Sequence, residues 1–207
     1  MQLSRDEYRK YIRAKRQQLS ESFQQQASQE LISQFSLLPE FNTSQHIALY
    51  LSVDGELNTT PLIQWLWQQG KQTYLPVIHP FSKGHLLFLN YTSTTPMTSN
   101  RYGILEPKLS KNEIRPINTL DLICTPLVGF DDRGHRLGMG GGYYDRTLQP
   151  WFTKGCGPKP IGLAHDCQHT KRLPIESWDV PLPKIVTPSQ IWQWESTNNP
   201  AIIPRKR

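Results

Sequence analysis

The sequence predicts a single α/β domain with a largely parallel sheet and helices on both of its faces. Short apolar runs typical of buried strands alternate along the chain with longer segments of helical periodicity. This alternation favours parallel strands that are connected by helices. The length of 207 residues suits one domain. We assign residues 1–190 to that domain and residues 191–207 to a polar and basic C-terminal tail.

Two helices are predicted at the start of the chain. Ser4 and Glu7 have the spacing of a capping box, which indicates a basic helix over residues 5–19. Ser20 is a second N-cap, and the apolar stripe that follows it recurs every four residues. We expect Pro39 to end this second helix, because proline cannot continue a helical ladder.

The rest of the chain predicts alternating strands and helices. A third helix is expected between Thr60, as its cap, and Gly70, and a fourth between Gly142 and Trp151. Residues 92–119 show little periodicity. The apolar runs that predict buried strands are 46–51, 72–78, 85–91, 121–128, 159–164 and 184–188.

The composition argues against several classes of protein. No apolar run approaches the ~20 residues that span a bilayer, and the N-terminal residues lack the apolar segment of a signal peptide. The three cysteines form neither a CxxC pair nor an even set, which argues against zinc and a disulfide framework. We therefore expect a cytoplasmic protein without membrane partners.

The formal net charge of +6 raises the question of nucleic acid. The basic residues concentrate in the first 16 positions and at 205–207, without interleaved aromatics and without a helix-turn-helix or RNP-like pattern. A small polyanion such as a nucleotide explains the charge as well. We expect no nucleic-acid partner, and a basic RNA-binding protein without catalysis remains an alternative.

The segment 129–146, with the sequence GFDDRGHRLGMGGGYYDR, is the most informative part of the chain. It follows a predicted strand and precedes a helix, where open α/β sheets bind ligands. Gly138, Gly140, Gly141 and Gly142 allow backbone N–H groups to approach an anion, and the helix N-terminus adds positive potential. The segment therefore indicates a phosphate site.

Charged side chains flank these glycines. Arg136 offers a permanent, planar positive charge for a phosphate, and Asp145 offers a hard oxygen ligand for Mg²⁺. Asp131 and Asp132 compete with Asp145 for that role. The spacing matches neither GxxxxGK[ST] nor GxGxxG. A loop that merely turns the chain is the alternative, and the flanking charges favour phosphate binding over it.

The pattern resembles the 5-formyltetrahydrofolate cyclo-ligases, also called methenyltetrahydrofolate synthetases. RLGMGGGYYDR is similar to the RLGxGxGYYD signature of that family, and RKYIR, YLSVDGEL, YGILEP and LPIESWDVPLPKIVTP follow in its order. The resemblance spans residues 5 to about 188. It implies an ATP-dependent cyclisation of 5-formyltetrahydrofolate to 5,10-methenyltetrahydrofolate, in which the formyl oxygen is phosphorylated, N10 then attacks, and ADP and phosphate are released.

The resemblance also implies site residues. Those implied to bind ATP are Arg9, Lys10, Arg13, Arg136, Gly138, Gly140, Gly141, Gly142, Tyr143 and Tyr144. Those implied to bind the folate are Tyr50, Leu51, Glu56, Tyr102, Met139 and Tyr143. Glu56 would accept hydrogen bonds from the pterin, and Tyr102 would stack on it. Asp145 and Asp179 are implied to hold Mg²⁺. Without the resemblance, the side chains outside residues 129–146 are ordinary surface or core residues, whereas the local chemistry already points to the glycines, Arg136 and Asp145.

One position departs from the family. Many members carry a lysine within the glycine loop, where this chain has Gly141. Arg136, Arg9 and Arg13 are the candidates to supply the missing charge. Three further side chains have a spacing that matches no common zinc pattern, and we treat them as structural, or at most as close to the substrate: His135, His165 and Cys167.

A sugar-phosphate isomerase is the main rival interpretation. It would use the glycine loop for a substrate phosphate and would need no ATP, but the GYYDR continuation favours the cyclo-ligases. The expected partners are ATP and 5-formyltetrahydrofolate, with or without a polyglutamate tail. The expected state is a monomer or a weak homodimer.

Overall fold

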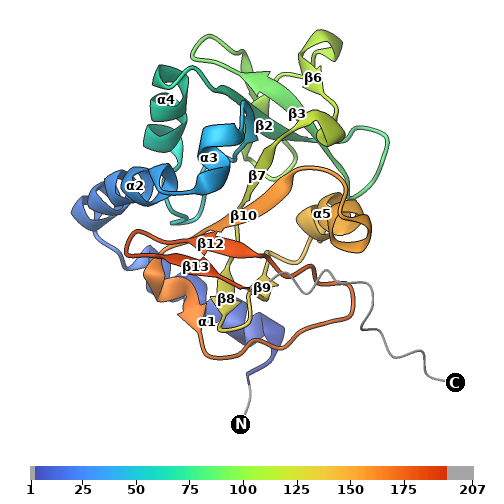
Figure 1. Cartoon of the computed structure of the whole chain (residues 1–207). Helices are drawn as coiled ribbons and strands as arrows, with labels where there is room; N and C mark the ends of the chain where they lie inside the picture. The colour runs from blue at the N-terminus through green and yellow to red at the C-terminus, as the bar shows by residue number, and fades with distance from the viewer. Residues whose placement is uncertain (1–2, 195–207) are drawn as a thin grey trace, which may run out of the picture.

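The computed structural model describes residues 3–194, and its main element is an eight-stranded sheet (Figure 1). In chain order its strands are β1 (His46–Ala48), β2 (Gln72–Ile78), β3 (Leu86–Tyr91), β6 (Ile114–Arg115), β7 (Leu122–Thr125), β10 (Lys159–Leu163), β12 (Lys184–Val186) and β13 (Ile191–Gln193). Their order in the sheet is β13-β12-β10-β7-β1-β2-β3-β6. The strands from β12 to β2 pair in parallel, while β13, β3 and β6 pair antiparallel at the edges. The prediction of a largely parallel sheet is confirmed.

Helices cover both faces of this sheet, as predicted. On one face lie α2 (Glu21–Ser36), α3 (Pro39–Thr43) and α4 (Thr60–Gln68), and on the other lies α5 (Tyr143–Lys154) (Figure 1). The first helix, α1 (Arg5–Gln17), packs against the short strand β8 (Gly129–Asp131) and the 3-10 turn η3 (Asp166–Gln168). Within residues 3–194, no helix has both the length and the apolar character that a membrane crossing requires.

The central strands are buried on both faces. Successive side chains of a strand point to opposite sides of a sheet. In β7, Leu122 and Cys124 join the core beneath α2 and α4, whereas Ile123 joins the core beneath α5. Strands that are buried in this way are apolar without interruption, which is why the sequence reveals them.

The first two helices begin where the sequence predicts. The capping box of Ser4 and Glu7 is present, and the Ser20 hydroxyl accepts a hydrogen bond from the Phe23 amide at 3.2 Å. Pro39 does not end the second helix, which stops at Ser36. Pro39 instead occupies the first turn of α3, a position where its missing N–H costs nothing.

Two predicted strands are shorter than their apolar runs by three residues or more. The run 121–128 is interrupted at Pro126, which lacks the N–H of a central strand, and the chain then enters a second sheet. That sheet consists of β11 (His169–Thr170), β8 and β9 (Arg136–Leu137). The run 46–51 pairs as a strand only as far as Ala48.

The aperiodic stretch 92–119 contains a hairpin and short turns. Its elements are β4 (Met97–Ser99), β5 (Leu105–Pro107), the 3-10 turns η1 (Lys111–Glu113) and η2 (Ile117–Thr119), and the edge strand β6. At the other end of the chain, β13 pairs with β12 within the range that was expected to be a tail. The main sheet therefore extends past residue 190. Residues 195–207 lie outside the described part of the chain.

Candidate active site

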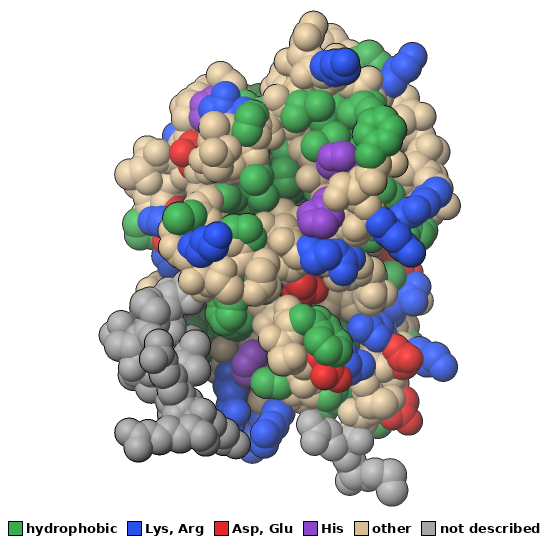
Figure 2. All heavy atoms as spheres, turned by 90° about the vertical axis from the view of Figure 1, so that its right-hand side faces the viewer, with side chains coloured by type: hydrophobic (Ala, Val, Ile, Leu, Met, Phe, Trp, Pro, Cys, Tyr) green, Lys and Arg blue, Asp and Glu red, His purple; other side chains and the backbone are tan. Residues whose placement is uncertain are grey.

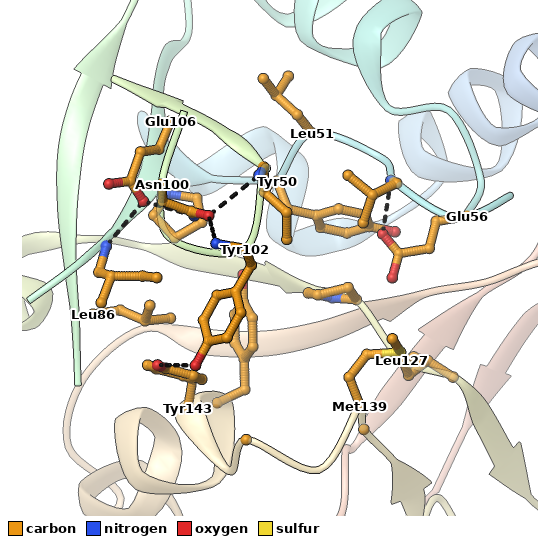
Figure 3. Close-up of a pocket in the computed structure, with 18 of the residues that line it drawn as sticks. Tyr50, Leu51, Glu56, Leu86, Asn100, Tyr102, Glu106, Leu127, Met139 and Tyr143 are labelled. Atoms are coloured by element: carbon orange, nitrogen blue, oxygen red, sulfur yellow. Dashed lines mark hydrogen bonds between the residues drawn. The ribbon is translucent and has the colours of Figure 1, made fainter. Parts of the chain in front are cut away.

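A cavity of about 630 Å³ opens at the carboxyl ends of the parallel strands (Figure 3). Tyr50 and Leu51 follow β1, Ile78 ends β2, and Pro126 and Leu127 follow β7. Ligands of open α/β sheets bind in this place. The walls are mostly apolar with a few polar groups, as is typical of a site for a small molecule.

All six residues that the resemblance implies for folate binding line this cavity: Tyr50, Leu51, Glu56, Tyr102, Met139 and Tyr143. They come from three separate parts of the chain, namely the segment after β1, the β4–β5 hairpin and the glycine loop. In Figure 3, Glu56 lies well apart from Tyr102 and Tyr143. The tertiary structure therefore brings the predicted residues to one cavity, and their individual roles stay predictions.

The glycine loop between β9 and α5 forms one wall of the cavity. Gly140 has a φ of 100° and Gly142, the N-cap of α5, has a φ of 64°, which side chains with a Cβ atom rarely adopt. Gly141 has no positive φ, but a Cβ atom there would lie 2.8 Å from ring carbons of Tyr143. The compact loop thus depends on glycine at all three positions, for two different reasons.

A second cavity, of about 430 Å³, lies against the same loop. It is lined by Gly140, by Arg146 and Gln149 of α5, and by His85 and Trp178. The two cavities have three lining residues in common: Gly141, Gly142 and Asp145. The glycine loop and the first turn of α5 therefore form a wall that two bound molecules could share.

Glu56 is a buried carboxylic acid at the first cavity. Its Oε2 accepts a hydrogen bond from the Val53 amide at 3.1 Å, and its Oε1 lies 3.9 Å from Nη1 of Arg16. Burial is the main cause that raises the pKa of Glu56 to about 7, and the Arg16 charge opposes that rise. Glu56 can therefore change its charge near neutral pH.

Arg16 is a buried guanidinium that sequence reasoning missed. Its Nε donates to the Asp54 carbonyl at 2.7 Å, and its Nη2 donates to Asp54 Oδ2 at 2.8 Å. Arg13 also donates to Asp54, at 2.6 Å. Hydrogen bonds from Arg13 in the first place, and then from Arg16, lower the pKa of Asp54 to about 2. The sequence did contain a signal that Arg16 could be buried, because Ile12 and Arg16 are four positions apart and so share one helix face.

The β4–β5 hairpin closes one side of the first cavity. The Tyr102 hydroxyl lies 3.2 Å from the Tyr143 hydroxyl, which also accepts a hydrogen bond from Arg101 at 2.6 Å. The bonds with Tyr102 and Arg101 lower the pKa of Tyr143. Asn100 and Glu106 stabilise the hairpin through a bond of 3.1 Å between their side chains. These contacts lie in a stretch without periodicity, so no sequence pattern pointed to them.

Most of the residues implied for ATP gather around the glycine loop. Six of them line the first cavity: Arg136, Gly138, Gly141, Gly142, Tyr143 and Tyr144. Gly140 lines the second cavity. Arg9 donates from Nε to the Gly138 carbonyl at 2.9 Å. Lys10 and Arg13 line neither cavity.

Arg136 and Tyr144 are buried beside the loop. Nη2 of Arg136 donates to Asp145 Oδ1 at 2.6 Å, while its Nε has no partner among residues 3–194. The Tyr144 hydroxyl is likewise buried without a partner in the described part of the chain. Burial lowers the pKa of Arg136 and raises that of Tyr144. Both side chains therefore have hydrogen-bonding capacity that a ligand could use.

The two residues implied for Mg²⁺ differ in their surroundings. Asp145 lines both cavities and also accepts a hydrogen bond from the Val180 amide at 3.3 Å. Asp179 lines neither cavity and forms a two-pronged ion pair with Arg5. Within residues 3–194, no three His, Cys, Asp or Glu side chains gather into a metal site. Asp145 fits a cation that is held mainly by phosphate oxygens, which is the usual situation of Mg²⁺.

The competing and discounted residues lie outside both cavities. Asp131 is buried and accepts hydrogen bonds from the backbone amides of Arg133, His135 and Leu173. Asp132 contacts His169 at 2.7 Å. His165 is buried, and burial lowers its pKa to about 4. These residues line neither cavity, and the same holds for His135 and Cys167.

Comparison with known proteins gives one consistent result. Residues 2–188 match the 5-formyltetrahydrofolate cyclo-ligase family. The chain is 49% identical over 183 residues to the 5-formyltetrahydrofolate cyclo-ligase of Escherichia coli (strain K12), covering 88% of this chain and 100% of that protein. It is 51% identical over 178 residues to the Haemophilus influenzae protein of the same name, covering 86% and 94% respectively.

A solved structure agrees with these sequence matches. The structure of Aquifex aeolicus 5,10-methenyltetrahydrofolate synthetase superimposes with a TM-score of 0.78 at 32% identity, covering 92% of this chain and 93% of that one. The family match over residues 2–188 includes the glycine loop and α5. The chain therefore belongs to the 5-formyltetrahydrofolate cyclo-ligase family.

Proposed function

We propose that this enzyme uses ATP to cyclise 5-formyltetrahydrofolate to 5,10-methenyltetrahydrofolate, with the folate in the first cavity and ATP in the second. The observation that carries the proposal is the wall shared by the two cavities, made of Gly141, Gly142 and Asp145. Two substrates bound on either side of one loop can bring their reacting atoms together.

The first cavity suits a reduced pterin. Its apolar walls accommodate the ring, and its aromatic side chains, Tyr102 and Tyr143, offer stacking surfaces. Glu56 is a hydrogen-bond acceptor at the other end, matching the N–H donors of the pterin. The contact would favour the ionised carboxylate and so lower the pKa of Glu56 when the folate binds.

The chemistry requires an activated formyl oxygen. The formyl oxygen attacks the γ-phosphorus of ATP and ADP leaves, which gives an iminium phosphate. N10 then adds to the formyl carbon and loses its proton to water, and the C–O bond breaks as phosphate departs. Arg136 and the backbone N–H groups of the glycine loop would bind the phosphoryl oxygens as their charge redistributes. Mg²⁺ held by Asp145 and phosphate oxygens would neutralise part of the phosphate charge.

The first prediction concerns the co-substrate. We expect methenyltetrahydrofolate, followed by its absorbance, to form from 5-formyltetrahydrofolate only when ATP and Mg²⁺ are both present, with one ADP released per product. The physical reason is that a formyl oxygen is a poor leaving group until it is phosphorylated. Full activity in excess EDTA, or with a non-hydrolysable ATP analogue, would contradict the proposal. A sugar-phosphate isomerase would release no folate-dependent ADP.

The second prediction concerns Glu56 and pH. Because the pKa of Glu56 is about 7 in the free enzyme, the affinity for the folate should improve as pH rises from 6 to 8 and the carboxylate ionises. Glu56→Gln should weaken folate binding at pH 8 by at least about tenfold, since a charge-assisted hydrogen bond contributes ~1.5–3 kcal/mol. The variant should also lose most of the pH dependence. Folate titrations at pH 6, 7 and 8 measure both effects.

Stability and ATP binding provide the controls for this variant. The pKa of Glu56 is higher in the folded protein than in the unfolded chain. Its contribution to the free energy of unfolding is therefore fully present at pH values below the unfolded-state pKa, and it is lost as the pH rises through 7. Glu56→Gln removes the group that is costly to ionise, so the variant should be at least as stable as the parent at pH 8. ATP affinity should change little. An unchanged folate titration in the folded variant would reject the role of Glu56.

Other expectations about partners and location stay predictions. Figure 2 shows the molecule from the side of α5, and Lys and Arg side chains are spread over this face without forming one stripe. On this face the basic side chains do not form the continuous stripe that is typical of a nucleic-acid interface. The cytoplasmic location, the polyglutamylated substrate and the monomeric or weakly dimeric state are likewise predictions.

A further inference from the structure

Arg146 connects three segments of the chain at the second cavity. Its Nε donates to the carbonyl of Gly84, in the turn between β2 and β3, at 2.9 Å. Its Nη2 donates to the carbonyl of Gly141 in the glycine loop. The guanidinium is thus oriented by two backbone acceptors that lie 62 and 5 positions away in the sequence.

The remaining nitrogen of Arg146 is available to a ligand. No acceptor among residues 3–194 contacts its Nη1, and this atom would lie 3.0 Å from a Cβ atom at Gly142. The nitrogen therefore lies directly beside the backbone at the N-terminus of α5, and Arg146 lines the second cavity. Asp145, the carboxylate in the same cavity, is already paired with Arg136 at 2.6 Å.

The other arginines near the loop are more fully engaged. Arg136 pairs with Asp145, Arg9 pairs with Asp6 at 2.5 Å, and Arg13 pairs with Asp54 at 2.6 Å. Arg146 has no carboxylate partner within the described residues. Its positive charge is therefore the least compensated of the four.

We propose that Arg146 binds the phosphates of ATP in the second cavity, and that it supplies the charge for which this chain has no lysine at position 141. The inference rests on the proposed function and adds a binding residue to it. Arg146 would contact the phosphates through Nη1, beside the N–H groups that the glycines expose.

The surroundings of Gly141 are consistent with a positive charge at position 146 in place of a lysine at position 141. A side chain at position 141 would meet the Tyr143 ring at 2.8 Å, and Tyr143 is in turn held by Arg101 and Tyr102. The carbonyl of Gly141 already accepts the bond from Arg146. A glycine at 141 and an arginine at 146 are therefore compatible in one loop conformation.

The test compares ATP binding in three variants by calorimetry, with Mg²⁺ present and folate absent. Arg146→Gln removes the charge and keeps an amide donor, whereas Arg146→Lys keeps the charge. Lys154→Gln removes an exposed charge from the far end of the same helix, about 12 Å away along the axis. We expect Arg146→Gln to raise the Kd for ATP about fivefold to tenfold. Arg146→Lys should regain most of the lost ATP affinity, and Lys154→Gln should bind ATP as tightly as the parent protein does.

The outcomes separate this inference from the proposed function. If Arg146→Gln binds ATP as tightly as Lys154→Gln does, the assignment of Arg146 is wrong. If Arg146→Lys is as weak as Arg146→Gln, the side chain only positions the loop, and the phosphate contact is also wrong. If the parent protein itself neither binds ATP nor forms methenyltetrahydrofolate with it, the proposed function fails first. Far-UV circular dichroism and thermal melts establish that each variant is folded.

Discussion

Replacing Arg16 with methionine is expected to lower the free energy of unfolding by about 3–5 kcal/mol, the usual cost of removing one partner from a buried ion pair. The Arg16 side chain is 0% exposed and contacts Asp54 and Glu56. Methionine fills much of the same volume, so the loss is mainly electrostatic. Two carboxylates then remain in a poorly solvated loop with less compensating charge. Urea unfolding followed by far-UV circular dichroism measures the change.

Arg13→Met is the matched control for this variant. Arg13 pairs with the same carboxylate at 2.6 Å, and it is the largest single cause that lowers the pKa of Asp54. Its side chain is nevertheless 40% exposed, so water can replace it, and the expected cost is only ~0.2–1 kcal/mol. Equal effects of the two substitutions would show that burial does not decide the contribution of Arg16.

The destabilisation by Arg16→Met should also depend on pH. The Arg16 charge lowers the pKa of Glu56 against the effect of burial. Without Arg16 the folded-state pKa of Glu56 rises further above its unfolded value, so more stability is lost as pH increases from 6 to 8. The difference from the parent should therefore be larger at pH 8. A smaller difference at pH 8 would contradict the placement of Glu56 beside Arg16.

Arg136→Gln is expected to reduce kcat/KM by about 100- to 1000-fold, the range found when a preorganised donor to developing charge is removed. Arg136 is buried, lines the first cavity, and reaches the wall that both cavities share through its bond to Asp145. The loss should appear mainly in kcat, because the phosphoryl charge redistributes in the transition state. Steady-state absorbance kinetics with both substrates varied provide the measurement.

Two controls separate chemistry from folding in this experiment. Arg133→Gln removes an exposed arginine from the turn between β8 and β9, three residues earlier, and should leave the kinetics unchanged. Arg136→Gln alone leaves the Asp145 carboxylate without its charged partner. The double variant Arg136→Gln with Asp145→Asn removes both charges, so it should be more stable than Arg136→Gln but equally inactive. Near-parental kcat in Arg136→Gln would exclude Arg136 from the phosphoryl-transfer step.

The fold was predictable because its core strands are buried on both faces. Such strands appear in the sequence as continuous apolar runs, and β2, β7 and β10 were recognised in that way. The direction of pairing at the edges was not predictable. The strand β3 returns antiparallel to β2 across a short turn, and β6 has only two residues. Neither feature changes the local periodicity on which the prediction rested.

Some residues of the candidate site could be predicted from the sequence, and others could not. The glycine loop was recognisable, since Gly140 and Gly142 adopt a backbone conformation that favours glycine. Glu56 and Tyr102 were placed by the resemblance and do line the first cavity. Arg146 was overlooked, although it follows the motif directly. Its position at the cavity depends on Gly84, which no local pattern connects to it.

The α/β class, the glycine loop at a strand-to-helix junction and the resemblance to the cyclo-ligases could all be recognised in the amino-acid sequence. Periodicity and motif spacing are local properties, and each of these conclusions depends on neighbouring residues. The groups that each charged side chain contacts became evident only in the three-dimensional structure. Arg16 reaches Asp54 across 38 positions, and Arg146 reaches Gly84 across 62. The partner of a buried or half-buried charge is chosen by long-range packing and desolvation, because it must compensate the charge where water cannot.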